Sequence, residues 1–330
     1  MLRSYKNTSV SLNCVSPIDD IIQRRSVMRV NGGGFMKLAY IFFAYTKPEL
    51  LIRIIKRLDA EGATFLIHVD KKIDDAFIHQ IEAAFPAKHN LFFTERVTIE
   101  WGDPGFFNAL MLAFKELETR NIDYDYAFTL STQDYPIKSQ AEMQRILASY
   151  EGKQLLEYMP MPNPEWANGG MHRIDRYHFW VGKRRFAFPP NILRKTLPII
   201  PKRKLPHGYQ PYAGSNWFNF TKEAIQYINE FVETDIGKDL VRFYSHTYIA
   251  SESFFHTVLL NSPFKDQCVN DELRYVKWGA GEARARVITV DDFEALKQSH
   301  ALFARKADDA VDSDILDMID RELLGMTSIP

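Results

Sequence analysis

A run of apolar residues, Tyr126 to Leu130, ends abruptly in the polar stretch 131–134, and this junction is the first place in the sequence that could do chemistry. The run shows no polar alternation, which is typical of a strand covered on both faces. Open α/β sheets bind ligands beyond the carboxyl ends of their strands. Asp134 is therefore predicted at a ligand-binding edge, as is Asp70 at the end of the run Thr64 to Val69.

Neither acid identifies a function by itself. A lone carboxylate is a poor magnesium site unless further oxygens join it, and Asp134 could equally hydrogen-bond a turn before Pro136. Asp70 could accept hydrogen bonds from a base or a ribose, or only from a strand-end turn. The pair Asp123-Tyr124-Asp125 looks like a metal-binding Asp-x-Asp motif, but it precedes the apolar run. It is interpreted as a solvated loop at the wrong end of the strand for a ligand site.

Residues in the carboxy-terminal half gain meaning only in combination. Glu252 is predicted in the first turn of a helix, where the helix dipole favours a carboxylate for stability alone. In isolation, Arg286 and Lys306 are ordinary surface cations, and Trp278 is an ordinary core residue. Spacing alone assigns none of them a role.

Composition excludes several classes of protein. The 330-residue chain carries 41 basic and 42 acidic residues, so no global positive field points to a nucleic-acid partner. It is 46% hydrophobic and 13% aromatic, enough for a sizeable core. Cys14 and Cys268 are too few for a disulfide framework and suit a reducing compartment. With no apolar run of about 18 residues and no signal-peptide core, the chain is predicted to be cytoplasmic.

The elements that would position these residues begin with a β-α-β pattern. Strand-like runs at Leu38 to Tyr45 and Thr64 to Val69 flank a helix predicted from Leu50 to Leu58, with Thr46 as its N-cap and Glu49 completing a capping box. Further predicted elements are a helix from Phe77 to Phe85, strands at Leu91 to Phe93 and Val97 to Trp101, a helix from Phe106 to Leu117, a helix capped by Ser139 and Glu142, strands at Gln154 to Tyr158 and Gly214 to Phe220, a helix capped by Thr221 and an apolar helix after Ser251. This alternation predicts an α/β fold with a mostly parallel central sheet flanked by helices.

Two stretches fall outside the pattern. Residues 1–35 are polar, charged and glycine-rich, and we expect a poorly ordered extension before a single domain at 36–330. Met159 to about Pro211 is an unusually long irregular segment, which is predicted to form a binding loop on the acceptor side of a site. Within it, Lys183 to Lys204 carries eight Lys or Arg residues interleaved with apolar ones. That pattern fits either an ordinary solvated loop or a segment resting on an anionic membrane surface.

Seven motifs, taken together, resemble the core-2/I-branching β-1,6-N-acetylglucosaminyltransferase family, which also contains peptide O-xylosyltransferases. They occur in the family's order and span roughly Met36 to Asp309. The motifs are IHVDKK (Ile67 to Lys72), EWGDPG (Glu100 to Gly105), LSTQDYPIK (Leu130 to Lys138), GSNWFNFTKE (Gly214 to Glu223), SESFFHTVLLNS (Ser251 to Ser262), RYVKWG (Arg274 to Gly279) and LFARK (Leu302 to Lys306).

The resemblance implies a GT-A-like glycosyltransferase fold, with a nucleotide-binding half at 36–150 and an acceptor-binding and catalytic half at 151–330. It also implies an inverting reaction that uses no metal or other cofactor. A single displacement needs a base on the acceptor hydroxyl, and a carboxylate suits this role. Glu252 matches the family's catalytic glutamate, although Ala250-Ser251 precede it where Pro-Asp is common.

Without a metal, fixed cations must stabilise the departing diphosphate. The resemblance assigns this role to Arg286 and Lys306, and Arg284 lies two residues from the first of them. Asp134 then becomes a positioning or donor-contact residue facing the donor cleft, with Glu252 across from it. The donor-binding residues that the resemblance implies are Phe43, Asp70, Trp101, Asp134, Arg286 and Lys306.

For the acceptor sugar the resemblance implies Glu157, Arg173 and Trp278, with Arg176 as a rival to Arg173. The expected donor is UDP-N-acetylglucosamine, the alternatives being UDP-xylose or a catalytically silent sugar-nucleotide or glycan-binding protein. Eukaryotic relatives have membrane anchors and several disulfides, whereas this chain suggests a bacterial cytoplasmic member. We therefore expect a glycan acceptor, carried on a lipid under assembly, and peripheral contact with the inner face of the membrane.

Overall fold

The computed structural model describes residues 35–86, 89–190, 202–279 and 284–326, and Phe35–Pro330 forms one compact unit. The extension expected at residues 1–35 lies, except for Phe35, outside the described residues. In the part of the chain that is described, no helix combines the length and apolar character needed to cross a bilayer.

A seven-stranded sheet forms the centre of the domain, in the order β12-β6-β11-β4-β1-β2-β3. Only β11 runs antiparallel to its neighbours, so the predicted mostly parallel sheet is confirmed. The strands are β1 (Leu38–Ala44), β2 (Ala63–Val69), β3 (Leu91–Phe93), β4 (Tyr126–Ser131), β6 (Gln154–Leu156), β11 (Asn219–Thr221) and β12 (Cys268–Asn270).

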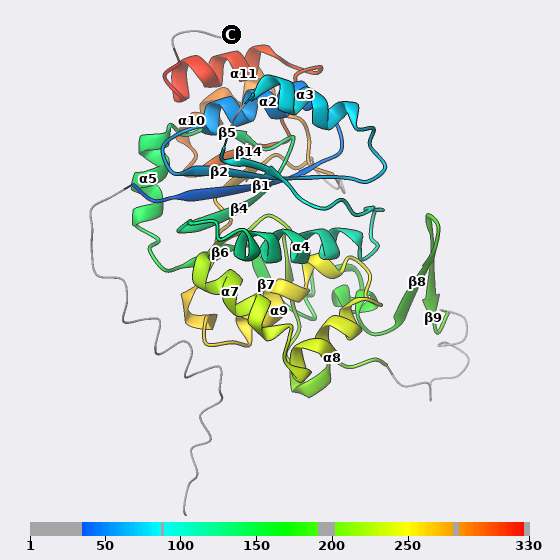
Figure 1. The fold of residues 1–330 in the computed structure, drawn as a ribbon. Helices are drawn as coiled ribbons and strands as arrows, with labels where there is room; N and C mark the ends of the chain where they lie inside the picture. Colours follow the sequence, from blue (N-terminus) through cyan, green and yellow to red (C-terminus); the bar gives the residue numbers. More distant parts are fainter. Residues whose placement is uncertain (1–34, 87–88, 191–201, 280–283, 327–330) are drawn as a thin grey trace, which may run out of the picture. The chain divides into compact units, whose positions relative to one another are not determined.

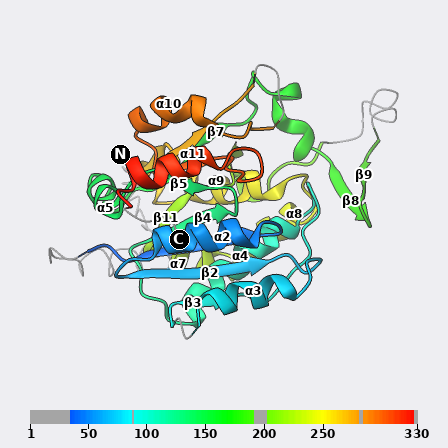
Figure 2. The same ribbon diagram turned by 90° about the horizontal axis from the view of Figure 1, so that it is seen from above.

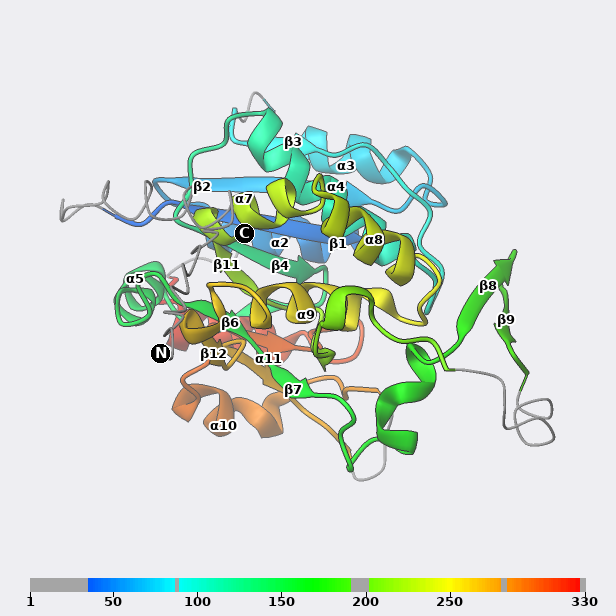
Figure 3. The same cartoon turned by 90° about the horizontal axis from the view of Figure 1, so that it is seen from below.

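Helices cover both faces of this sheet (Figure 1). The views from above and from below each show one helical layer in front of the sheet, with the other layer behind it (Figures 2 and 3). One layer contains α2 (Pro48–Leu58), α3 (Ala76–Ala84), α10 (Phe293–Gln298) and α11 (Asp314–Met318); the other contains α4 (Gly105–Thr119), α7 (Lys222–Phe231), α8 (Asp235–Tyr244) and α9 (Phe254–Leu260), and α5 (Gln140–Ala148) lies at the side. Coverage on both faces explains why β1 and β4 are buried along their whole length.

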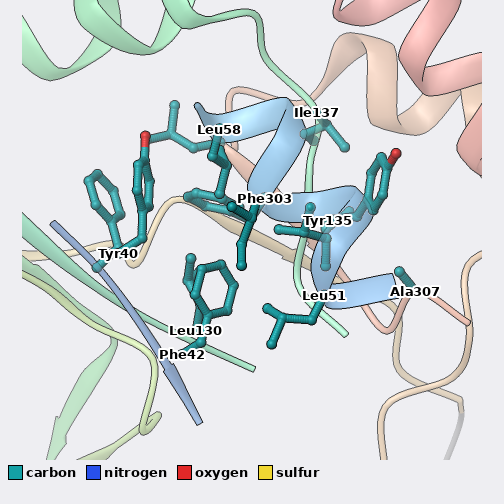
Figure 4. Close-up of a cluster of buried hydrophobic side chains, with 14 of the residues drawn as sticks. Tyr40, Phe42, Leu51, Leu58, Leu130, Tyr135, Ile137, Phe303 and Ala307 are labelled. Carbon is teal, nitrogen blue, oxygen red and sulfur yellow. The ribbon is translucent and has the colours of Figure 1, made fainter. Parts of the chain in front are cut away.

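The core is built on aromatic side chains of the central strands. Tyr40 of β1 lies between Phe65 of β2 and Phe128 of β4, with ring centroids 5.6 and 5.5 Å away. Phe303 closes the cluster from a second sheet, at 5.7 Å from Phe128 (Figure 4). That sheet joins β13 (Arg274–Val276), β14 (Phe303–Arg305) and β5 (Tyr135–Pro136). The carboxy-terminal segment is thereby fixed against the end of β4.

The predicted helix caps are partly confirmed. Ser139 and Glu142 form the expected capping box on α5, and the Thr221 hydroxyl accepts a hydrogen bond from the Ala224 amide on α7. The prediction for α2 is wrong: Lys47, in a left-handed conformation, is its N-cap residue. Its ammonium pairs with Asp308 at 2.6 Å, so a distant contact fixes this turn instead of a local capping box.

Three predicted strands differ from the structure. The run predicted from Gln154 to Tyr158 is divided between β6 and the strand β7 (Tyr158–Pro160), which belong to different sheets. Residues 97–101 form no strand, because the Val97 and Ile99 carbonyls accept hydrogen bonds from the Lys71 amide and the Lys72 ammonium. The run predicted from Gly214 to Phe220 is interrupted at 215–218. Its first part belongs to β10 (Tyr212–Gly214), which pairs with β7, and only its end belongs to β11.

The segment predicted to be irregular after Met159 contains a hairpin. Strands β8 (Tyr177–Val181) and β9 (Arg184–Phe188) form a two-stranded ribbon that projects from the body of the domain (Figures 1 and 3). Short 3-10 helices, η1 (Ala167–Arg173) and η2 (Pro206–Gly208), flank it along the chain. Residues 191–201, within the basic segment Lys183 to Lys204, lie outside the described part.

Candidate functional site

The carboxyl edge of the main sheet gathers polar side chains from both halves of the sequence. Asp70 follows β2, Asp134 follows β4 and Glu157 follows β6. Because β11 runs the opposite way, the loop that precedes it, including Trp217, reaches the same edge. Glu272 follows β12 there as well. Topology therefore concentrates candidate ligand-binding groups at one edge of the sheet, where α/β folds bind ligands.

Asp134 lies where the sequence predicts, but the expectation that it faces an open donor cleft is wrong. Its side chain is fully buried and ion-paired with Arg274, which is also fully buried, and with Arg305 at 3.3 Å. The Ser131 amide and hydroxyl donate to Oδ2 at 2.7 and 2.5 Å. Burial alone would raise the pKa of Asp134, but the two guanidinium charges and these hydrogen bonds outweigh it and hold the pKa below 3.8. Its carboxylate orders two cations instead.

A cluster of cations, which we call the cationic wall, lies beside Asp134 and consists of Arg274, Arg305, Arg286 and Lys306. Arg305 lies over the Trp217 ring at 4.3 Å, and Arg274 over the same ring at 5.5 Å. Lys306 follows Arg305, and its amide donates to the Arg286 carbonyl at 3.2 Å. Burial, together with the charges of Arg305 and Arg284, lowers the pKa of the Lys306 ammonium.

Arg286 and Lys306, which are distant in sequence, therefore lie on adjacent backbone segments. Arg284 is close enough to act electrostatically on Lys306. Such a concentration of cations is suited to a diphosphate or another polyanion.

Glu252 is held by Arg173, as the assignment of both to one site requires. An Arg173 guanidinium nitrogen donates to Glu252 Oε2 at 2.5 Å, and the two side chains keep 19% and 28% of their surface exposed. Arg173 also lies over the Trp166 ring at 4.4 Å. Glu252 is the last residue of a 3-10 turn, η3 (Ala250–Glu252), and not part of the following helix α9, so the predicted first-turn position is wrong.

The turn that carries Glu252 is fixed by buried hydroxyl groups. The Ser253 hydroxyl donates to the Tyr212 carbonyl at 2.6 Å, and the Tyr244 hydroxyl lies 3.0 Å from Ser253 Oγ and 2.9 Å from Thr257 Oγ1. Ile249, just before the turn, has φ 52°, a conformation that is costly for a β-branched residue. Strain of this kind persists only where surrounding contacts determine the backbone, so the carboxylate is held in a defined position.

Two further carboxyl groups lie at this edge of the sheet, Glu157 beside Glu252 and Glu272 beside Glu157. Burial of Glu157 and, to a lesser extent, the negative charge of Glu252 raise the pKa of the Glu157 carboxyl. Glu272 is 8% exposed, and burial raises its pKa to about 7, with Arg274 and a hydrogen bond to Ser215 offsetting only part of the effect. Burial therefore brings the pKa of Glu272 close to neutral pH.

Glycine is required where β7, β10 and α9 meet. A Cβ added to Gly214 would lie 1.9 Å from the Glu157 carbonyl oxygen and 2.9 Å from His256 Nε2. Burial lowers the pKa of His256 to about 4, so this fully buried imidazole is neutral. Only glycine permits the close approach that places Glu157 beside α9.

The expected nucleotide-contact residues have different surroundings. Phe43 is 4% exposed and packs edge-on against Phe106 at 4.8 Å. Its ring is therefore packed inside the protein and offers no free face to a base. Asp70 is 5% exposed and accepts a hydrogen bond from the Lys72 amide at 3.0 Å. Trp101 is 83% exposed and contacts Tyr248 edge-on at 5.6 Å. Of the two aromatic residues, Trp101 is the one whose ring is accessible to a ligand.

The loop that carries Trp101 is tied to the Glu252 segment. The Ile249 amide donates to the Gly102 carbonyl at 3.1 Å, and a Cβ on Gly102 would lie 2.4 Å from the Tyr248 ring. The Tyr248 amide in turn donates to the Arg173 carbonyl at 3.2 Å. Trp278 is 62% exposed and pairs through its backbone with Ala285.

The rejected Asp-x-Asp pair lies at the opposite edge, before β4. Asp123 pairs with Lys37 at 2.6 Å and with Lys222 at 3.3 Å, and Asp125 accepts a hydrogen bond from the Lys37 amide. A shallow hollow of about 630 Å³ at this edge is lined by Lys37, Asp123, Arg120 and neighbouring residues. Within the described ranges, no three His, Cys, Asp or Glu side chains cluster in a way that could hold a metal ion.

The model of the core-2/I-branching enzyme family, a family of glycosyltransferases, matches residues 38–297, well over half of the chain. The chain belongs to this family. The curated relatives that it resembles include xylosyltransferase 2 of Rattus norvegicus, 25% identical over 315 residues, and xylosyltransferase 1 of Homo sapiens, 24% identical over 315 residues. These matches cover 89% and 88% of this chain but only 34% and 31% of the relatives, so the core-2/I-branching chain spans about a third of their length.

Two of the solved structures that resemble the core-2/I-branching chain are a galactosyltransferase and a mannosyltransferase. The galactosyltransferase LgtC, in complex with donor and acceptor sugar analogues, gives a TM-score of 0.38 at 9% identity and covers 88% of this chain and 97% of its own. The mannosyltransferase Ktr4p of S. cerevisiae, in complex with GDP, gives 0.32 at 11% identity and covers 68% and 66%. These scores are low, and the family assignment rests on the sequence match.

Four residues of this core-2/I-branching site were not singled out from the sequence. Arg274, Arg305 and Trp217 each lie inside a quoted family motif, yet their types and spacing do not distinguish them from ordinary surface or core residues. Glu272 carries no local signal at all. Only the pairing of β14 with β13 and the antiparallel direction of β11 bring these groups to one edge.

Proposed function

We propose that the protein transfers a sugar from a UDP-sugar to a glycan acceptor by one inverting displacement that forms a β-linkage. Glu252 supports this proposal most directly. Its carboxylate is partly exposed, is fixed by Arg173 at 2.5 Å, and lies at the sheet edge where a cationic wall is also assembled. A fixed carboxylate is suited to accept a proton, and a cationic wall to stabilise a leaving diphosphate.

In the proposed step the acceptor hydroxyl oxygen attacks the anomeric carbon of the donor. The bond from that carbon to the diphosphate oxygen breaks, the electron pair leaves with UDP, and the hydroxyl proton passes to Glu252. Arg173 orients the carboxylate through its hydrogen bond to Oε2.

Arg286 and Lys306 are proposed to stabilise the charge that develops on the diphosphate, without a metal or other cofactor. The adjacent backbone of these two residues and the electrostatic contact of Arg284 with Lys306 support this role. Bringing an anion beside Lys306 would favour its protonated form, which offsets the lowering of its pKa by burial. Asp134 acts behind this wall as a positioning residue for Arg274 and Arg305.

N-acetylglucosamine is the first sugar we propose, and xylose is a second candidate that one observation favours. Two of the similar curated proteins are xylosyltransferases, of the rat and of humans. We further propose that Trp101 and Asp70 contribute to nucleotide binding, and that Glu157, Arg173 and Trp278 face the acceptor. A glycan assembled on a lipid carrier in the cytoplasm is the acceptor class we propose.

A UDP-release assay tests the reaction. UDP-N-acetylglucosamine and UDP-xylose are compared with and without EDTA, in wild type, Glu252→Gln and the surface control Glu233→Gln, whose side chain is 72% exposed. Glu252→Gln is expected to lose about 10²- to 10⁴-fold in kcat with little change in UDP affinity, because a general base contributes that much. Full activity of Glu252→Gln would contradict the base assignment, and loss of wild-type activity with EDTA would contradict the metal-free mechanism. UDP binding without turnover of any donor would indicate a silent binding protein.

A further inference from the structure

The β8–β9 hairpin has an apolar outer face. Register places Tyr177 opposite Phe188 and Phe179 opposite Phe186. Side chains two residues apart in a strand share a face, so Val181 joins these four rings. The exposed fractions of Tyr177, Phe188, Phe179, Phe186 and Val181 are 44%, 56%, 44%, 54% and 71%. The usual pattern of a half-buried sheet, with polar side chains toward solvent, is reversed here.

The other face of the hairpin is attached to the domain. His178 is buried, and its amide donates to the His246 carbonyl at 2.9 Å. Arg185 lies over the Tyr248 ring at 3.9 Å and its guanidinium contacts the His178 ring at 3.1 Å. Two rings of the apolar face also contact the domain: Arg203 lies over the Tyr177 ring at 4.3 Å, and the His246 ring lies 6.1 Å from Tyr177 and 5.0 Å from Phe179. The apolar side chains nevertheless keep 44% to 71% of their surface exposed, so this face remains open to solvent.

Basic side chains accompany this apolar face. Lys183 and Arg184 are exposed at the turn of the hairpin, and Lys202 is exposed near its base. Residues 176–190 contain no Asp or Glu. Asp175, at the start of the hairpin, is buried and lies 3.6 Å from Arg176. The projecting ribbon is thus aromatic and positively charged.

We propose that the β8–β9 hairpin docks the protein on an anionic membrane surface, with its aromatic face in the headgroup region and Lys183 and Arg184 on lipid phosphates. Aromatic rings favour the interface between water and hydrocarbon, and nearby Lys or Arg residues add attraction to anionic lipids. The same hairpin of a second copy would offer another basic face, because its residues 176–190 carry no Asp or Glu to pair with these cations. This inference does not depend on the proposed reaction.

Docking would also bring the site to the membrane. The hairpin contacts Tyr248 through Arg185, Tyr248 is hydrogen-bonded to Arg173, and Trp101 packs on Tyr248. A continuous series of contacts therefore links the hairpin to the segment that leads to Glu252. A substrate held in the same membrane would be presented to the site without diffusing from bulk solution.

Vesicle co-sedimentation tests the docking. Wild type is mixed with vesicles of phosphatidylcholine alone or of phosphatidylcholine with phosphatidylglycerol, beside Phe179→Ser/Phe186→Ser, Lys183→Glu/Arg184→Glu and the control Val311→Ser, which removes an apolar side chain 61% exposed on another part of the domain. Wild type and the control Val311→Ser are expected to bind the vesicles that contain phosphatidylglycerol and not those of phosphatidylcholine alone. The loss of two rings in Phe179→Ser/Phe186→Ser is expected to weaken vesicle binding at least about tenfold. In Lys183→Glu/Arg184→Glu, the loss of each cation is expected to weaken it about fivefold. Added salt should weaken the binding of wild type.

Three results would overturn the proposal. They are no binding of wild type to anionic vesicles, equal binding of Phe179→Ser/Phe186→Ser and wild type, and self-association in sedimentation velocity that the serine variant abolishes, which would assign the face to a second copy. Thermal melting is measured for each variant, because substitutions of exposed side chains should leave it unchanged and loss of binding must not come from unfolding.

Discussion

Replacing Asp134 with asparagine separates a positioning role from direct contact with the donor. The substitution keeps the size of the side chain and removes its charge, leaving Arg274 fully buried and Arg305 11% exposed without their counter-ion. At 3.3 Å and an effective dielectric constant of about 20, the attraction of Arg305 to Asp134 is about 5 kcal/mol. Breaking a buried ion pair by removing one partner costs about 3 to 5 kcal/mol, so we expect Asp134→Asn to lower the free energy of unfolding by about 4 kcal/mol.

Urea unfolding measures this loss, with Asp239→Asn as the control. Asp239 pairs with Arg242 at 2.9 Å on the surface, where both side chains are largely exposed, so its removal is expected to cost less than about 1 kcal/mol. Because the folded pKa of Asp134 lies below 3.8, its contribution is present above that pH and is lost as pH falls through the folded pKa. The difference between wild type and Asp134→Asn should therefore shrink only in strong acid. A loss at pH 7 no larger than that of the control would refute the reasoning.

Three further outcomes are expected. Glu272→Gln should be more stable than wild type by up to about 3 kcal/mol at pH 8 and equal to it near pH 4.5. The reason is that the raised pKa of Glu272, about 7, makes wild-type stability fall between pH 4.5 and 7. Unfolding measured across this pH range checks the expectation, and a constant difference between the two proteins would contradict it. Lys306→Met should weaken UDP binding about tenfold or more in calorimetry, since a charge-assisted hydrogen bond is lost, and unchanged affinity would remove Lys306 from the diphosphate site. Arg173→Ala should lower kcat and Arg173→Lys should restore part of it, whereas equal activity of all three forms would show that the Glu252 contact is not used.

The central sheet could be predicted because its signals are local. Uninterrupted apolar runs specify β1, β2 and β4, and the capping-box residues specify the start of α5. Residues 97–101 show the limit of such signals: their composition favours a strand, but side-chain and backbone donors from Lys71 and Lys72 occupy their carbonyls. A distant ion pair of Lys47 likewise replaces the expected cap of α2. Hydrogen-bond partners that are remote in sequence decided both outcomes.

The sequence by itself determined the family, the succession of the main strands and helices, and the edge of the sheet at which Asp70 and Asp134 lie, because strand ends and motif order are properties of neighbouring residues. Tertiary structure alone decided what these groups do. The pairing of β13 with β14 buried Asp134 between two arginines, and the antiparallel direction of β11 brought Trp217 to the same edge. The charge state of a buried carboxylate depends on groups that the fold brings within a few ångströms, and the sequence does not show which groups these are.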